Sequence, residues 1–216
     1  VSADAIAYPN LTVTIDRQTG TARLVLAGPT QPPPADAAAL HAAGAAAWSL
    51  AAARELDDAI LDLRLNEPEI GVWLLETQGD PALVLAHDAF LADAAAAGDW
   101  FAAEIRHYWK RTLKRLDVTS RSLVALIGPG SCFAGLLAEL AFAADRSYML
   151  AGGLEGDNRL DATLTLSASN FGPMPMANGL ARLATRFLGD EGALRAAEDA
   201  VGESLDAEQA EALGLV

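Results

Sequence analysis

The sequence predicts an α/β domain whose sheet is at least partly parallel. Short apolar segments, typical of buried strands, alternate with segments whose apolar residues recur at helical spacing. Hydrophobic residues make up 52% of the 216 residues, enough to bury a substantial core. This composition excludes a disordered chain, a collagen-like chain and a disulfide-rich mini-protein. No internal repeat or linker divides the chain.

The N-terminal part predicts a hairpin followed by a long helix. Residues 11–16 and 21–26 alternate polar and apolar side chains on either side of a turn at 17–20, which is typical of a β-hairpin. Glycine and proline residues make 28–34 a loop. The apolar residues of 36–65 then recur at helical spacing, so we expect one helix there.

The middle of the chain predicts further strands and a helix. The continuous apolar runs at 70–75 and 122–127 indicate buried strands, and a shorter run at 82–85 indicates another. We expect a loop at 77–81, and we expect residues 89–116 to be mostly helical.

The C-terminal part predicts an apolar helix, two short strands and a helical end. Glycines turn the chain at 128–130, and residues 134–144 follow as an almost wholly apolar helix. Strands are expected at 148–150 and 163–166, with a polar loop between them. Helices are then expected at 178–188, 190–200 and 206–213.

Charge and residue usage exclude several kinds of partner. Twenty-nine acidic against fifteen basic residues give a net charge of −14, which opposes phosphate backbones and excludes a nucleic-acid function. No apolar run is long enough to predict a membrane span, and no secretory signal is expected. The single cysteine, Cys132, permits no internal disulfide and favours a cytoplasmic location. The scattered histidines His41, His87 and His107 predict no metal site.

Basic residues crowd the end of the helix expected at 89–116. They are Arg106, Lys110, Arg111, Lys114 and Arg115. Cations near a helix C-terminus interact favourably with the helix dipole. The same side chains could instead bind a phosphate group or neutralise acids at a subunit contact, and the sequence leaves these interpretations open.

Glu139 is the one acidic residue in the apolar helix 134–144. A carboxylate among apolar neighbours is costly to bury without a partner. Desolvation would raise its pKa and suit it to general acid–base catalysis, whereas an ion pair with a buried base would make its role structural. The turn at 128–135 precedes the helix, and free backbone N–H groups at such a turn can bind an oxyanion.

Four motifs occur in order along the chain. Residues 125–145 contain a buried strand, a glycine-rich turn and a helix with Glu139 and, six residues later, Asp145. The other motifs are Asn-Phe-Gly-Pro-Met-Pro at 170–175, Gly-Leu-Ala-Arg-Leu at 179–183 and the stretch 205–216. From about residue 11 onward, this set resembles the crotonase (enoyl-CoA hydratase/isomerase) superfamily.

The resemblance implies the ββα-superhelix of the ClpP/crotonase fold, lacking the C-terminal helices that members usually add. Residues 1–10 would be an N-terminal extension and residues 11–216 the crotonase-like domain. A narrower resemblance, carried by 53–60 and 116–135, is to the benzoyl-CoA-dihydrodiol lyases, longer proteins whose C-terminal half this chain would represent. Members of that group open an oxygenated, dearomatised ring on coenzyme A and release formate in aerobic benzoate degradation.

Members of the superfamily stabilise a thioester enolate with two backbone N–H groups. The resemblance assigns these N–H groups to Leu136 and His87, in places where ordinary members have glycine. Any residue except proline can supply a backbone N–H, so the oxyanion hole stays possible. The resemblance also implies weaker substrate contacts at Gly135 and Cys132.

Hydratases of the superfamily use two carboxylates, and Glu139 takes the place of the first. Ala168 stands where the second is expected, so ordinary two-carboxylate hydration is not expected. Three functions stay open: a segment of the lyase, with this segment as the non-catalytic half; an enoyl-CoA hydratase or isomerase using Glu139 alone; and a non-catalytic scaffold. The expected ligand is an acyl-CoA or aryl-CoA thioester without a separate cofactor, and the expected partner is a homo-oligomer or a second crotonase-like half.

Overall fold

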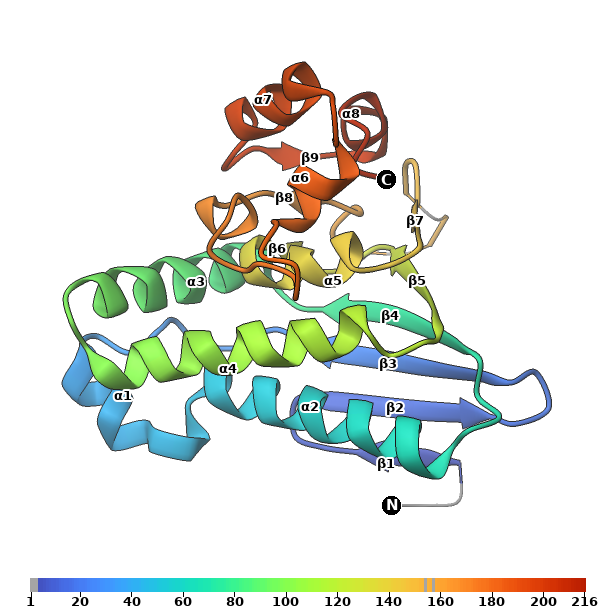
Figure 1. Ribbon diagram of the computed structural model, residues 1–216, viewed down its shortest axis with the longest axis horizontal. Helices are drawn as coiled ribbons and strands as arrows, with labels where there is room; N and C mark the ends of the chain where they lie inside the picture. The colour runs from blue at the N-terminus through green and yellow to red at the C-terminus, as the bar shows by residue number, and fades with distance from the viewer. Residues whose placement is uncertain (1–3, 154, 157) are drawn as a thin grey trace.

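A six-stranded mixed sheet dominates the computed structural model, which describes residues 4–153, 155–156 and 158–216 (Figure 1). The strand order is β1-β2-β3-β4-β5-β7, antiparallel from β1 to β3 and parallel from β3 to β7. The strands are β1 (Ala5–Ala7), β2 (Leu11–Asp16), β3 (Thr21–Ala27), β4 (Val72–Gln78), β5 (Ser122–Ile127) and β7 (Arg146–Met149). The predicted α/β class with partly parallel pairing is confirmed.

Long helices pack against this sheet. Helices α2 (Trp48–Asn66) and α4 (Trp100–Asp117) lie side by side, and α3 (Pro81–Ala96) packs against α4 (Figure 1). The short α1 (Ala37–Ala43) and η1 (Gly44–Ala46) precede α2. The buried sides of the helices meet the inward side chains of the strands in one continuous core.

The hairpin of β2 and β3 follows directly from its alternating sequence. Every second residue of β2, from Leu11 to Ile15, is buried, and the residues between them are exposed. Asp16 ends the strand, and its carboxylate accepts hydrogen bonds from the backbone N–H groups of Gln18 and Thr19 at 2.9 and 3.2 Å. The predicted hairpin is confirmed.

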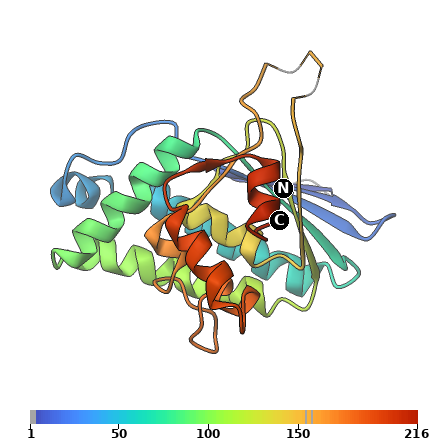
Figure 2. The same cartoon turned by 90° about the horizontal axis from the view of Figure 1, so that it is seen from above.

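The C-terminal part adds a small three-stranded sheet and short helices. Strand β6 (Phe133–Ala134) is parallel to β8 (Leu164–Thr165), which is antiparallel to β9 (Ser204–Leu205). The helical elements are η2 (Gly135–Leu137), α5 (Ala138–Phe142), η3 (Ala168–Asn170), α6 (Arg182–Arg186), α7 (Glu191–Asp199) and α8 (Ala207–Ala212). Figure 1 shows this part stacked beyond α5, away from α2, and Figure 2 views the stack from above.

Two predicted elements differ from the structure. Residues 82–85 are not a strand but the beginning of α3, because the Asp80 carboxylate caps the helix through the Ala82 N–H at 2.8 Å and Pro81 occupies the first position. A short apolar run fits a buried helix as well as a buried strand. The helix predicted at 134–144 is shorter, since β6 and η2 replace its first part.

Other predicted boundaries also shift. The helix expected at 36–65 is divided by η1, and the one expected at 89–116 is divided between α3 and α4 at Gly98, which has a φ of 92°. Residues 5–7, expected within an N-terminal extension, form the edge strand of the main sheet. Within the described residues, every helix is too short or too polar to span a membrane.

Candidate functional site

The side chain of Glu139 projects from α5 into a closed environment and is 1% exposed. Both carboxylate oxygens accept hydrogen bonds. Oε1 accepts from Nδ2 of Asn170 at 2.7 Å, and Oε2 accepts from Nη1 of Arg182 at 2.6 Å. The polar partners of this acid are therefore supplied by the protein itself.

Arg182, the first residue of α6, holds Glu139 and a second acid at the same time. Its side chain is also 1% exposed. Nε and Nη2 donate to the two carboxylate oxygens of Asp117 at 2.9 and 2.6 Å, and Nη1 donates to the carbonyl of Met174 at 3.0 Å. The planar fork of a guanidinium permits this bidentate pair while leaving Nη1 free to reach Glu139. One buried cation thus bridges acids from α4 and α5.

Asn170 reaches Glu139 because a capping box fixes its side chain. Its Oδ1 accepts from the backbone N–H of Ser167 at 2.9 Å, and the Ser167 hydroxyl accepts from the backbone of η3 in return. The amide Nδ2 is thereby turned toward α5, where it also donates to the carbonyl of Gly135 at 2.9 Å. Local capping in η3 therefore positions a donor for the buried acid.

A further carboxylate lies beside these groups. Asp88, from α3, accepts hydrogen bonds from the hydroxyls of Ser167 and Ser169 at 2.6 and 2.7 Å. A β-carbon added at Gly135 would lie 2.6 Å from Oδ2 of Asp88, and Gly135 has a φ of 47°, so the turn requires glycine. The Asp88 carboxylate therefore occupies the space beside the backbone of Gly135, which directly precedes Leu136. We call the whole set the buried network: Asp88, Asp117, Glu139, Ser167, Ser169, Asn170 and Arg182.

Burial controls the protonation of Glu139. Removal from water disfavours the charged form and raises the pKa of Glu139 to about 7, against the opposing effects of Arg182 and Asn170. A pKa in this range suits proton transfer near neutral pH. Both carboxylate oxygens of Glu139 already accept hydrogen bonds from Asn170 and Arg182, however, so the geometry fits a structural acid that is paired with a buried base.

The two backbone N–H groups expected to bind an oxyanion differ in their surroundings. Leu136 lies in the first turn of η2, where N–H groups lack partners within the helix, and its side chain is buried. His87 lies inside α3, where helical hydrogen bonds occupy the backbone N–H groups. The helix α3 begins at Pro81, ahead of the start expected at residue 89, and the assignment of an oxyanion-binding N–H to His87 stays a prediction.

The side chains of His87 and Cys132 also have structural surroundings. Nε2 of His87 donates to the carbonyl of Gln31 at 3.0 Å, and the ring meets Trp48 edge to face. Burial lowers the pKa of His87. Burial also raises the pKa of the Cys132 thiol to about 11, while its backbone N–H donates to the hydroxyl of Thr77. A protonated, enclosed thiol fits a packing role.

Comparison with solved structures identifies the fold. An enoyl-CoA hydratase from Geobacillus kaustophilus matches 100% of this chain and 69% of its own, with a TM-score of 0.61 at 20% sequence identity. An enoyl-CoA hydratase/isomerase from Xanthobacter autotrophicus matches 97% of this chain and 66% of its own, with a TM-score of 0.60 at 17% identity. This chain has the crotonase fold. The fold class that the resemblance implied is confirmed.

The amino-acid sequence is also similar to that of a known lyase. The chain is 46% identical over 209 residues to the benzoyl-CoA-dihydrodiol lyase of Aromatoleum evansii, which covers 97% of this chain and 36% of that protein. The resemblance stated from the sequence is thus confirmed, although the chain spans nearer a third of this relative than the half expected. No family model matches the chain.

Sequence reasoning on this crotonase-fold chain found Glu139 but not the residues around it. Arg182 and Asn170 lie inside two motifs that carry the resemblance, yet their spacing does not connect them to α5. One signal was available, because an acid in an apolar helix requires a buried base. Arg182 stands between the apolar residues Ala181 and Leu183, which is the pattern such a base would show.

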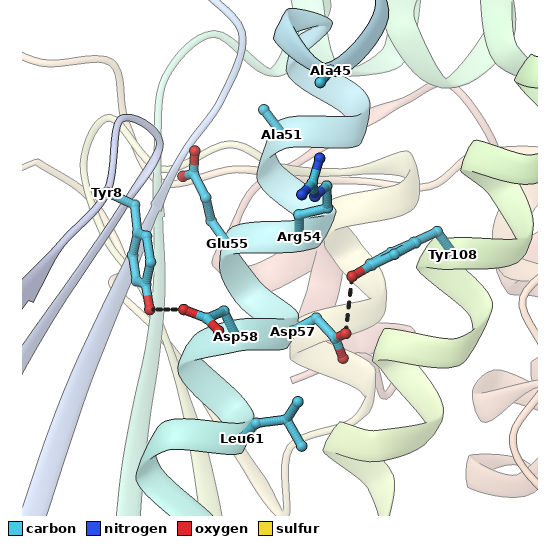
Figure 3. Close-up of a pocket in the computed structure, with 9 residues that line it drawn as sticks. All are labelled: Tyr8, Ala45, Ala51, Arg54, Glu55, Asp57, Asp58, Leu61 and Tyr108. Atoms are coloured by element: carbon cyan, nitrogen blue, oxygen red, sulfur yellow. Dashed lines mark hydrogen bonds between the residues drawn. The ribbon is translucent and has the colours of Figure 1, made fainter.

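A second group of acids lines an open groove of about 500 Å³ between α2, α4 and the N-terminal strands (Figure 3). We call it the acidic groove. The Tyr8 hydroxyl donates to Asp58 at 2.8 Å, and the Tyr108 hydroxyl and Nη1 of Arg115 donate to Asp57 at 3.0 and 2.6 Å. Burial and the hydrogen bond to Asp58 raise the pKa of the Tyr8 phenol. Among the residues described, no three His, Cys, Asp or Glu side chains are arranged to hold a metal ion.

Proposed function

We propose that this chain is a segment of a CoA-thioester lyase similar to benzoyl-CoA-dihydrodiol lyase, and that the segment is its non-catalytic half. The identity of 46% over 97% of the chain supports the assignment to a lyase. Coenzyme A belongs to the substrate, so the reaction uses no separate cofactor. Catalysis takes place elsewhere in the protein, and this segment contributes the crotonase fold as a structural partner.

The closed buried network supports the non-catalytic role. A general acid or base must come within hydrogen-bond distance of the substrate atom that it protonates or deprotonates. Both oxygens of Glu139 are held by Asn170 and Arg182, so substrate would have to displace a charged partner. The Asp88 carboxylate against Gly135 would also repel the negative charge that develops on a thioester oxygen.

An enoyl-CoA hydratase or isomerase that uses Glu139 alone is the second candidate. One observation favours it, namely the pKa of Glu139 at about 7, which suits acid–base catalysis at neutral pH. This candidate requires the carboxylate to leave Asn170 or Arg182 during turnover. The two candidates therefore give opposite expectations for one substitution.

The rate at which the full-length protein converts benzoyl-CoA dihydrodiol distinguishes the lyase with a non-catalytic segment from the hydratase or isomerase that uses Glu139. We expect Glu139→Gln to keep kcat within about twofold of the wild type, because loss of a general acid or base costs about a hundredfold or more. Asn170→Ser is the matched control, since it loosens the same network and leaves the carboxylate in place. Activity is expressed per folded protein, measured by circular dichroism.

Two results would reject the proposal. A hundredfold loss of kcat in Glu139→Gln, with Asn170→Ser close to the wild type, would make Glu139 catalytic. Turnover of an enoyl-CoA thioester without turnover of the dihydrodiol would replace the lyase by the hydratase or isomerase.

A further inference from the structure

The basic residues of α4 lie on two sides of the helix. Nη1 of Arg115 donates to Asp57, and the guanidinium of Arg111 lies 4.2 Å from the centroid of the Tyr108 ring, so these two contact residues that line the acidic groove. The other three are four residues apart and therefore share one side of the helix. We call this side the basic flank: Arg106, Lys110 and Lys114.

The basic flank has no acidic partner among the residues that the structure describes. Across 4–153, 155–156 and 158–216, no ion pair includes Arg106, Lys110 or Lys114. Nη1 of Arg106 is buried and has no hydrogen-bond partner among the described residues. Burial and the charges of Arg106 and Lys114 lower the pKa of Lys110. Three cations thus repel one another in a chain of net charge −14, which calls for an acidic partner from outside.

The end of the basic flank favours a protein partner over a small anion. Val118 follows Lys114 by four residues, caps α4 and is 53% exposed. The flank therefore continues into an exposed apolar side chain, which a phosphate group or a nucleic-acid backbone would leave uncovered. A partner surface that combines carboxylates with apolar side chains would satisfy both parts.

The C-terminal helices carry such a surface. Residues 190–216 contain eight acidic residues and one basic residue. A groove of about 350 Å³ between α7 and α8 is lined by Asp199 and Glu203 together with the apolar side chains of Leu205 and Leu213. Figure 1 places α7 and α8 beyond α5, away from α2. The residues that line this groove come from residues 196–213, and none of them belongs to α4.

We propose that the basic flank of one chain docks into the α7–α8 groove of a second copy of the same chain. Lys110 and Lys114 would pair with Asp199 and Glu203, and Val118 would enter the apolar part of the groove. This contact joins two different surfaces, so it is head to tail and builds a closed ring or an open row of copies. The inference does not depend on the proposed function, because it uses only surface chemistry.

Sedimentation velocity of the intact chain tests the contact. We expect oligomers at about 20 mM salt that dissociate at about 500 mM, where surface charges are screened. Lys110→Glu with Lys114→Glu, and separately Asp199→Lys with Glu203→Lys, should each weaken self-association by about tenfold or more. Arg54→Glu with Arg146→Glu is the matched control for the lysine reversal: it makes the same change in net charge at exposed positions outside both surfaces, and it should leave association within about twofold of the wild type.

An equimolar mixture of the two reversed variants gives the decisive result. Within either variant, the basic flank and the groove carry charges of the same sign and repel each other. In the mixture, the unchanged flank of one variant can bind the unchanged groove of the other, and the two reversed surfaces can also bind each other. We therefore expect oligomers that contain both variants. Circular dichroism shows that both variants are folded. Monomers under all conditions, an equal effect of the control, or no recovery in the mixture would each overturn the proposal.

Discussion

The buried network and the acidic groove use the same chemical groups with different access to water. Glu139 in the network is held by Arg182 and an amide, and Asp57 in the groove is held by Arg115 and a phenol. The network excludes solvent, so the pKa of Glu139 rises to about 7. The groove opens to solvent, and its tyrosines reach their acids from opposite sides of α2 (Figure 3).

This difference shows that hydrogen-bond partners alone do not define the role of an acid. In the groove, water can replace a lost partner of Asp58, which is exposed, and Asp57, which is buried, keeps Tyr108 when Arg115 is lost. In the network, a buried charge that loses its charged partner stays uncompensated. We therefore expect the stability of this chain to depend strongly on a few polar contacts in its C-terminal part and much less on those of the N-terminal groove. Three substitutions or conditions test this contrast.

Removal of the buried cation should have the largest effect. Arg182→Met leaves Glu139 and Asp117 without their shared partner, so we expect the free energy of unfolding to fall by about 3–5 kcal/mol. Urea denaturation near pH 7 measures it. Arg115→Met is the matched variant in the groove, and it should cost less than half as much, because Arg115 is 32% exposed and Tyr108 still serves Asp57. An equal decrease in the free energy of unfolding for Arg182→Met and Arg115→Met would contradict the difference that we infer between the network and the groove.

The pH dependence of stability should show an intermediate effect. Glu139 has an ordinary pKa of 4.5 when unfolded and about 7 when folded, so between these values the folded chain keeps a proton that the unfolded chain has lost. The free energy of unfolding should therefore fall as the pH rises through this window, by about 1–3 kcal/mol. Glu139→Gln should lack this decrease. A difference between the two proteins that is constant with pH would show that Arg182 outweighs burial.

Loss of a hydroxyl in the acidic groove should have the smallest effect. Tyr8→Phe removes the hydrogen bond to Asp58 but leaves that acid accessible to water, so we expect a loss of about 0.5 kcal/mol. Thermal unfolding, followed by circular dichroism, measures it, with Tyr108→Phe as the companion variant. A loss near that of Arg182→Met would mean that the groove is as closed as the network.

Local patterns explain what the sequence could predict. The alternation in 11–16 and 21–26 gave the hairpin, because the side-chain period of a strand is visible in the sequence. Glu139 stood out because an acid in an apolar helix is costly without a partner. Both are properties of neighbouring residues, which need no knowledge of the tertiary structure.

Long-range and boundary-dependent features escaped prediction. Arg182 meets Asp117 across 65 positions, and no spacing rule connects residues so far apart. The error at 82–85 came from the start of α3, where the pair Asp80–Pro81 is a helix start signal that an apolar run of four residues obscured. Placing that boundary correctly would have put the His87 N–H inside a helix.

The position of Arg182 has a consequence for synthesis of the chain. It follows Glu139 by 43 positions and Asp117 by 65, so both acids leave the ribosome well before the base that neutralises them. Until α6 has emerged, α5 cannot be enclosed at low cost, and its apolar side chains stay accessible to chaperones and proteases. Closure of this part of the core therefore depends on the arrival of one late arginine.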